Sequence, residues 1–241
     1  MAKKNKGAAP LPKSSRYYDL LSDELKQEVP DSATITSLTR GQREKLDKGL
    51  HIRTTPITWG IPFDEVLFAK WFTFYIRLNQ MPWDNFATSE STYLPDARNE
   101  IHNNFLDLDC KYLMMLDSDV LCPPGMVEVL MSHNKHLVGG WYKNKAYHKP
   151  PHPIVYDFID ETKTLNFKAR EEPGEGLERV DGMGAGCWLM SQELAQALGK
   201  SPYSLEKGGE DLCLSKKVMD LGYKMYVDWD MACAHCGVSW V

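Results

Sequence analysis

Two carboxylates separated by one residue, Asp117 and Asp119, follow directly on the continuous apolar run Tyr112–Leu116. Such a run is typical of a central β-strand covered on both faces. Residues i and i+2 of an extended segment point the same way, so both side chains can reach one cation. Open α/β sheets bind ligands at the carboxyl ends of their strands, and hard oxygen ligands suit Mg²⁺ or Mn²⁺ that bridges phosphates. The pattern predicts a metal and phosphate site; the alternative is a solvated acidic turn.

His235 can supply a third ligand from a distant segment of the chain. Its imidazole suits Mn²⁺ and other transition metals. Two alternatives exist for this residue. One is a zinc site built from Cys233, His235 and Cys236, which lacks a partner Cys/His pair at zinc-finger spacing. The other is a histidine that is merely packed in the protein.

Two further carboxylates, Glu210 and Asp211, precede the helical spacing of Leu214, Val218 and Leu221. That spacing predicts a helix with one buried face, and at about 100° per residue the two carboxylates flank this face. Periodicity does not choose between them. Either can deprotonate or orient an incoming hydroxyl, so both are candidate catalytic residues. The alternative is structural, because acidic residues in a first turn stabilise the helix macrodipole.

Three alternate glycines occur in the segment 181–187, where Gly184 and Gly186 are the later two. The spacing Gly-x-Gly-x-Gly differs from the Gly-x-Gly-x-x-Gly of dinucleotide-binding loops, so an NAD site is rejected. Glycines at these positions are expected to let a substrate approach the backbone closely.

The elements that position these residues alternate between strand and helix. Pro95 is expected to open a helix with Ala97, Ile101 and Phe105 on one face. From Val180 to Leu198 we expect a strand, a glycine-rich turn and a helix, whereas residues 143–180 should form loops that shape the site. The other expected strands are Ile57–Ile61, Tyr112–Leu116, Leu137–Tyr142, Ile154–Tyr156 and Lys224–Val227, and the other expected helices are Phe63–Leu78, Met126–Met131 and Glu210–Leu221. The alternation predicts the α/β class, a mainly parallel sheet with helices on both faces.

Composition narrows the class of protein. The chain has 241 residues, of which 43% are hydrophobic and 25% charged, which fits a globular protein and neither disorder nor a fibrous repeat. A net charge of −5 gives no positive field for nucleic acid, so nucleic-acid binding is not expected. We expect a basic tail and arm over residues 1–50 and one catalytic domain over 51–241. We find no signal peptide and no membrane span, and we expect the six cysteines to be reduced in a soluble, cytoplasmic protein.

The ordered elements together resemble the GT-A type nucleotide-sugar-dependent glycosyltransferases, especially the family-two-like enzymes. The resemblance runs from about Thr54 to Gly237. It rests on the first strand ending in Pro62, Ala97-Arg98-Asn99, Leu116-Asp117-Ser118-Asp119, Gly184-Ala185-Gly186-Cys187-Trp188-Leu189, Gly209-Glu210-Asp211-Leu212-Cys213 and Ala234-His235-Cys236-Gly237.

The resemblance implies a Mn²⁺ or Mg²⁺ cofactor, a nucleoside-diphosphate sugar donor with UDP favoured, and a hydroxyl acceptor. It implies metal ligation by Asp117, Asp119 and His235, and a catalytic base at Asp211 with Glu210 as the next candidate. It also implies that the residues that bind the nucleotide are Pro62, Arg98, Asp117, Ser118, Asp119, Gly184 and Gly186. Two features depart from the commonest pattern: the first strand reads Thr-Trp-Gly-Ile-Pro, and the Gln-x-x-Arg-Trp-like acceptor signature of processive synthases is absent. The second departure favours transfer of a single sugar.

Two other functions compete with glycosyl transfer. A nucleotidyltransferase shares the nucleotide-binding α/β layout, but it would typically carry a Gly-rich, Arg/Lys-bearing loop after its first strand, which residues 57–65 lack. A non-catalytic sugar-binding relative is the other, and the joint presence of Asp117, Asp119, Asp211 and His235 counts against it. The sequence leaves the sugar, the acceptor, the oligomeric state and the stereochemistry at the anomeric carbon open.

Overall fold

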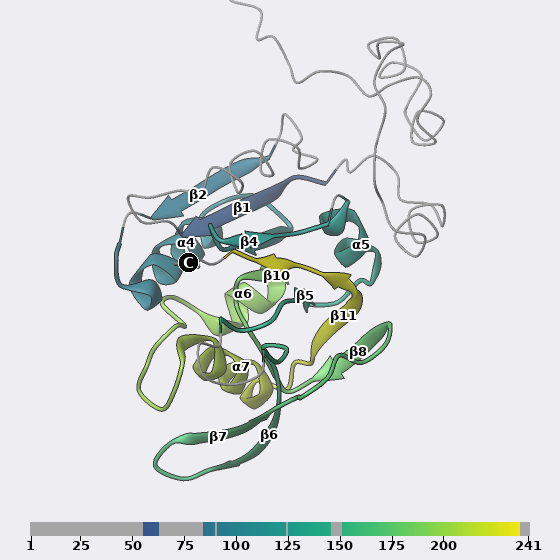
Figure 1. Ribbon diagram of the computed structural model, residues 1–241. Helices are drawn as coiled ribbons and strands as arrows, with labels where there is room; N and C mark the ends of the chain where they lie inside the picture. The colour runs from purple at the N-terminus through teal and green to yellow at the C-terminus, as the bar shows by residue number, and fades with distance from the viewer. Residues whose placement is uncertain (1–54, 63–83, 90, 124, 146–150, 237–241) are drawn as a thin grey trace, which may run out of the picture.

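A computed structural model of the chain describes residues 55–62, 84–89, 91–123, 125–145 and 151–236. The tail and arm expected over residues 1–50 and the helix expected over 63–78 lie outside these residues. Figure 1 shows a central twisted sheet with helices packed against it and a long hairpin of β6 and β7 that extends from one end. The expected α/β class is confirmed.

The main sheet has seven strands in the order β2-β1-β3-β10-β5-β11-β8. β1 pairs in parallel with β2 and β3, and β5 pairs in parallel with β11, whereas β10 is antiparallel to both of its neighbours and β8 is antiparallel to β11. Five strands therefore run one way, and β10 and β8 run the other. The bounds are β1 Ile57–Pro62, β2 Asn85–Ser89, β3 Tyr112–Leu116, β5 Leu137–Trp141, β8 Leu177–Val180, β10 Cys187–Ser191 and β11 Met225–Ala232.

The sequence of β3 explains why the sheet is buried on both faces. Successive side chains of a strand point to opposite faces, and all five residues of β3 are apolar. Leu113 and Met115 join one hydrophobic core, and Met114 and Leu116 join the other. Helices supply the cover for both cores. Among the described residues, the helices on the first face are α4 Leu94–Leu106, α6 Gln192–Leu198 and α7 Glu210–Asp220, and α5 Met126–Ser132 lies on the second face.

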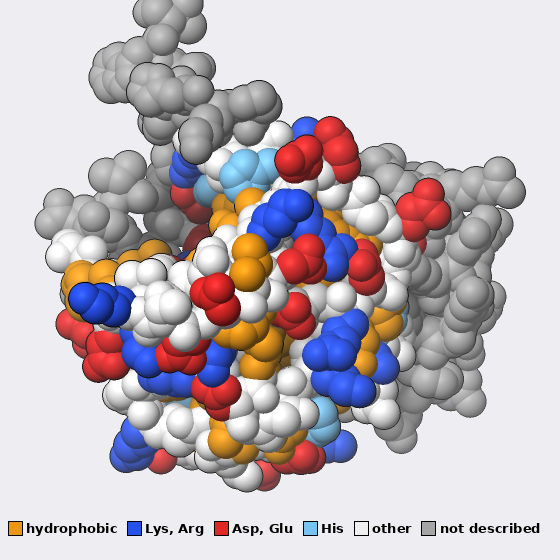
Figure 2. Space-filling model, turned by 90° about the horizontal axis from the view of Figure 1, so that it is seen from below, with side chains coloured by type: hydrophobic (Ala, Val, Ile, Leu, Met, Phe, Trp, Pro, Cys, Tyr) orange, Lys and Arg blue, Asp and Glu red, His pale blue; other side chains and the backbone are white. Residues whose placement is uncertain are grey.

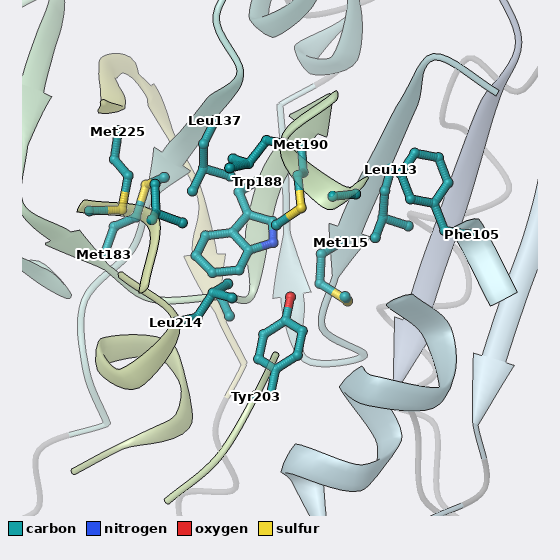
Figure 3. Close-up of a cluster of buried hydrophobic side chains, with 14 of the residues drawn as sticks. Phe105, Leu113, Met115, Leu137, Met183, Trp188, Met190, Tyr203, Leu214 and Met225 are labelled. Atoms are coloured by element: carbon teal, nitrogen blue, oxygen red, sulfur yellow. The ribbon is translucent and has the colours of Figure 1, made fainter. Parts of the chain in front are cut away.

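The first core is built around Trp188, which is fully buried in the antiparallel strand β10. Figure 3 shows its indole ring among side chains from several elements, with Leu214 of α7 and Tyr203 on one side and Met190 and Leu137 on the other. Because β10 sits between β3 and β5, its side chains join the two halves of the sheet to one core.

Two smaller sheets complete the fold. One consists of β12 Ala234–His235 paired with β4 Val120–Leu121, the two residues that follow Asp119. The other has the order β7-β6-β9, with bounds Leu165–Ala169, Val155–Glu161 and Gly182–Met183. These small sheets attach the segments after β3 and β5 to the main sheet near the carboxyl ends of its parallel strands.

Most of the expected elements that fall on described residues are confirmed. Pro95 lies in the first turn of α4, whose residues Ala97, Ile101 and Phe105 are buried. The strands at Ile57 and Tyr112 and the helices at Met126 and Glu210 begin at the residues expected.

Three expectations were wrong. The glycine-rich turn leads into strand β10, and the helix α6 comes only after it, because Cys187–Ser191 is a second apolar run that the sheet buries. Residues 143–180, expected to hold one strand at Ile154–Tyr156 and otherwise loops, contain that strand in the longer β6, and also its hairpin partner β7 and the strand β8. Leu221, expected on the buried face of the last helix, follows that helix as its C-cap and is 46% exposed, and Cys213 is buried on the helix instead.

The described helices are short, and surface charges of both signs are mixed on the face shown in Figure 2. In the part of the chain that the structure describes, no helix is long and apolar enough to cross a membrane. On the face shown in Figure 2, acidic and basic side chains are interspersed rather than gathered by sign.

Gly139 allows close packing between β5 and β10. A Cβ atom at this position would lie 2.6 Å from the backbone oxygen of Cys187, so a strand would have to move. We expect Gly139→Ala to lower the free energy of unfolding by about 1–3 kcal/mol, as overpacked cores do. Urea unfolding checks this, with Gly208→Ala as the control because a Cβ there meets nothing within 4 Å. Equal stability of the two variants would contradict the packing argument.

Candidate active site

The carboxyl end of β3 carries the two carboxylates that the sequence singles out. The backbone N–H of Asp117 donates to the oxygen of Gly186 at 2.9 Å, which ties the end of β3 to the glycine turn before β10. Ile57 pairs with Tyr112 and Gly60 with Met115, and the same register continued puts Pro62 level with Asp117. The ends of β1 and β3 therefore meet at one edge of the sheet, where open α/β folds bind ligands.

A buried arginine joins three elements at this edge. Arg98 of α4 is 2% exposed, and its Nη2 donates to both carboxylate oxygens of Asp117 at 2.9 Å. Its Nη1 donates to Glu210 in the first turn of α7. One guanidinium thus holds the end of β3 and the start of α7 together, with one of its terminal nitrogens on each carboxylate.

The charges of this cluster determine its protonation states. Burial by itself lowers the pKa of Arg98, but the carboxylates of Asp117 and Glu210 raise that pKa above its ordinary value. The guanidinium therefore stays charged between two carboxylates and leaves a net charge of about −1. Within the described residues, the Nε of Arg98 is buried and has no hydrogen-bond partner. Loss of either type of charge would leave an uncompensated ion in a dry place.

Asp119 meets His235 across the ladder of β4 and β12. Val120 pairs with His235 in that ladder, and the backbone N–H of Cys236 donates to the oxygen of Asp119 at 2.7 Å. As a result, the Nε2 atom of His235 lies 3.5 Å from Oδ2 of Asp119. The ammonium of Lys145 also contacts Asp119. Burial raises the pKa of Asp119, but His235 and Lys145 outweigh it and leave that pKa below its ordinary value.

The tautomer of His235 follows from its second hydrogen bond. Nδ1 lies 2.9 Å from the backbone oxygen of Lys143, and because a carbonyl only accepts, Nδ1 carries the proton there. Nε2 is then the ring nitrogen that faces Asp119. A carboxylate oxygen and an imidazole nitrogen oriented by a backbone carbonyl form a donor set that fits Mn²⁺.

Tyr142, directly after β5, packs between the glycine turn and His235. Its hydroxyl accepts from the N–H of Gly186 at 2.8 Å, and its ring lies edge-on to that of His235 with centroids 5.1 Å apart. A Cβ atom on Gly184 or Gly186 would lie 2.6 Å from this hydroxyl, and one on Gly186 would lie 2.7 Å from a carboxylate oxygen of Asp117. The close approach that these glycines permit is therefore to the protein's own side chains.

Asp211 and Glu210 have different surroundings although they are neighbours. Glu210 is paired with Arg98, whereas Oδ1 of Asp211 accepts from the N–H of Leu212 at 2.8 Å. Burial and the adjacent charge of Glu210 raise the pKa of Asp211 to about 6. Burial and the carboxylate of Asp211 raise the pKa of Tyr156, on β6, to about 12. Asp211 is thus a carboxyl group that titrates close to neutral pH.

The structure brings most of the predicted site residues to one region, in a different grouping from the one expected. Asp119 and His235 face each other, but the carboxylate of Asp117 is held by Arg98. Arg98 is itself buried, and its guanidinium pairs with the protein's own carboxylates, those of Asp117 and Glu210. Ser118 lies between the two aspartates and is half-buried.

Sequence reasoning missed three residues of this region. Tyr142, Lys145 and Tyr156 touch or perturb the predicted site, yet none belongs to a recognisable motif. Only Tyr142 had a signal, since it follows directly on the strand of residues 137–141 and so stands at the same sheet edge.

Comparisons with known proteins bear on the fold. No family model matches the sequence, and no curated protein matches it either. The crystal structure of A197 from STIV is similar, with a TM-score of 0.56, 18% sequence identity, and coverage of 77% of this chain and 87% of that one. The crystal structure of GalNAc-T7 with UDP, GalNAc and Mn²⁺ has a TM-score of 0.50 and 13% identity, covering 75% of this chain and 43% of that one. At these identities the likeness is one of fold, and it is a likeness to a GT-A-like architecture.

Proposed function

We propose that this chain is a metal-dependent glycosyltransferase that moves one sugar from a nucleoside-diphosphate donor, with UDP favoured, to a hydroxyl acceptor. The observation that carries the proposal is the pairing of Asp119 with His235 beside the carboxyl end of β3, where Nε2 lies 3.5 Å from the carboxylate and Nδ1 is held by a backbone carbonyl. The similar fold of GalNAc-T7, a structure that holds UDP, GalNAc and Mn²⁺, supports it. A cytoplasmic location is part of the proposal, and the six free cysteines of the structure support it.

Asp119 and His235 are the residues that would hold Mn²⁺ or Mg²⁺. A bound cation of this kind neutralises the charge that develops on a departing diphosphate. Lys145, which contacts Asp119, adds a flexible positive charge at the same place. Both carboxylate oxygens of Asp117 accept hydrogen bonds from Arg98, so Asp117 would contact the nucleotide-sugar donor from a fixed position.

Asp211 is the residue we assign to the acceptor. Its carboxylate, on the first turn of α7, would take the proton of the attacking hydroxyl as that oxygen bonds to the sugar. A base works best when its pKa lies near the working pH, and the pKa of Asp211 is raised to about 6. Glu210 is engaged by Arg98, which leaves Asp211 as the favoured base of the two.

The test is a screen of nucleotide sugars by thermal shift, with and without Mn²⁺, followed by analysis of the products with sugar acceptors. A donor that binds only the folded state at a hundredfold excess over Kd stabilises it by about 2.7 kcal/mol. Stabilisation by one nucleotide sugar that requires Mn²⁺, with transfer of its sugar, is expected. Release of diphosphate from a nucleoside triphosphate would instead identify a nucleotidyltransferase, and binding without turnover a sugar-binding protein.

The metal pair gives a prediction. Because Asp119 and His235 would share one cation, Asp119→Ala and His235→Ala should each abolish Mn²⁺-dependent nucleotide binding, measured by calorimetry. His136→Ala is the matched control, since its side chain is 45% exposed and pairs only with surface groups. Circular dichroism monitors the fold. Unchanged Mn²⁺ dependence in both variants would contradict the assignment.

Arg98 gives a second prediction. Arg98→Met leaves the carboxylates of Asp117 and Glu210, which are 21% and 15% exposed, without their buried partner, so it should lower the free energy of unfolding by about 3 kcal/mol, the low end of the cost for a buried pair. Urea unfolding measures this loss. Arg179→Met is the control, because the Arg179 side chain is 58% exposed and lies 3.8 Å from its acidic partner. A similar small effect of both changes would show that the cluster contributes little.

Asp211 gives a third prediction. Removing a base that acts only in the transition state should lower turnover of Asp211→Asn about 10²–10⁴-fold while sparing donor binding. The wild-type rate should rise as pH passes through about 6, the pKa of Asp211, and the variant should lack this rise. Glu210→Gln is the comparison. Near-normal turnover of Asp211→Asn, or retention at the anomeric carbon, would remove Asp211 from the role of base.

The same pKa also predicts a change in stability. The folded-state pKa of Asp211 lies above the ordinary value of 3.8, so the folded protein binds the proton more tightly than the unfolded chain. Its favourable contribution is therefore present at pH below about 4 and is lost as pH rises through about 6. The asparagine variant should be the more stable protein at pH 8 and gain nothing at pH 4, as urea unfolding can measure.

A further inference from the structure

Three cysteines from separate segments bring their sulfur atoms together in the second core. Cys122 follows β4, Cys187 begins β10, and Cys233 lies between β11 and β12. Their Sγ atoms all lie within 4.8 Å of one another. Cys187 is 3.0 Å from Cys122 and 3.7 Å from Cys233. Among the residues that the structure describes, no other group of three His, Cys, Asp or Glu residues is as close.

A fourth sulfur atom completes the group. The Sδ atom of Met126, in the first turn of α5, lies 3.3 Å from the sulfur of Cys187 and 3.9 Å from that of Cys233. Cys122, Cys187 and Met126 are 5%, 0% and 1% exposed, whereas Cys233 is half-buried. The group is therefore closed on three sides by apolar packing and has an entry at Cys233.

The spacing suits a bound ion. Four sulfur ligands about 2.3 Å from a tetrahedral zinc ion are about 3.8 Å from one another. The separations of 3.0, 3.3, 3.7 and 3.9 Å between sulfur atoms in the structure lie around this value. Thiolate and thioether sulfur are soft ligands that select Zn²⁺ or Cu(I) and not Mg²⁺ or Mn²⁺.

We propose that Cys122, Cys187 and Cys233, with the thioether of Met126, bind one thiophilic cation, Zn²⁺ or Cu(I). Each thiol that becomes a ligand releases its proton to solvent as its sulfur–metal bond forms, and no redox step is involved. This set differs from the zinc site considered for Cys233, His235 and Cys236, because His235 faces Asp119 instead.

The position of the thiol site allows it to support the pairing of Asp119 with His235. Leu121 pairs with Ala234 in the ladder of β4 and β12, and Cys122 and Cys233 are the next residues outward from that pair. Asp119 and His235 lie at the other end of the same ladder. A cation held by the thiols would fix the ladder that brings the carboxylate and the imidazole together.

The experiment uses the full chain, reduced and freed of metal, titrated separately with Zn²⁺ and Cu(I) against competing chelators. One ion per chain is expected by native mass spectrometry, with at least a tenfold loss of affinity in Cys233→Ser. Serine is tolerable there because the residue is half-buried. Cys213→Ser is the matched control, since this cysteine is 5% exposed in α7 and stands outside the group.

Two more variants sharpen the result. Met126→Leu should weaken Cu(I) more than Zn²⁺ because the softer ion gains more from a thioether. Asp119→Ala should keep the thiol site while losing Mn²⁺-dependent nucleotide binding, so the failure of one proposal is distinguishable from the failure of the other. Equal affinity in Cys233→Ser and Cys213→Ser, no binding of either ion by the wild type, or a disulfide between Cys122 and Cys187 in the isolated protein would overturn the inference.

Discussion

The buried guanidinium of Arg98 is the interaction on which the candidate site depends. It comes from α4, and it reaches Asp117 at the end of β3 and Glu210 at the start of α7. Those elements are far apart in sequence, and a single side chain sets their distance. The guanidinium is nearly dry and its two carboxylate partners are only partly exposed, so the loss of Arg98 would leave two poorly solvated charges unpaired. The sheet edge and the first turn of α7 are thereby held in one arrangement.

The neighbouring aspartate is held in a different way. Asp119 contacts the ammonium of Lys145, which is partly exposed and which another cation could replace, and it faces the imidazole of His235 on a short strand. The carboxylate of Asp117 meets a fixed guanidinium instead. Two carboxylates one residue apart thus avoid mutual repulsion because each has its own positive partner. The carboxylate of Asp117 is held rigidly, whereas the carboxylate of Asp119 can exchange its lysine partner for another cation.

Much of the fold could be predicted because local signals agreed with burial. The apolar run of β3 and the proline at the start of α4 marked elements that the structure confirms. Strand β10 was missed since a glycine turn before an apolar run reads equally well as the entry to a helix. The pairing of Asp119 with His235 rests on contacts between distant segments, which no local spacing encodes. Resemblance to a family supplied that expectation, whereas Tyr142 and the thiol group had no comparable signal.

The choice between Glu210 and Asp211 illustrates how the arginine decides chemistry as well as structure. Helical periodicity placed both carboxylates at the same rim and could not separate them. Arg98 takes Glu210, and the paired Glu210 then presents its negative charge to Asp211. That charge and the burial of Asp211 both disfavour its ionised form, and they raise its pKa to about 6. The residue left out of the ion pair is therefore the one able to accept a proton near neutral pH.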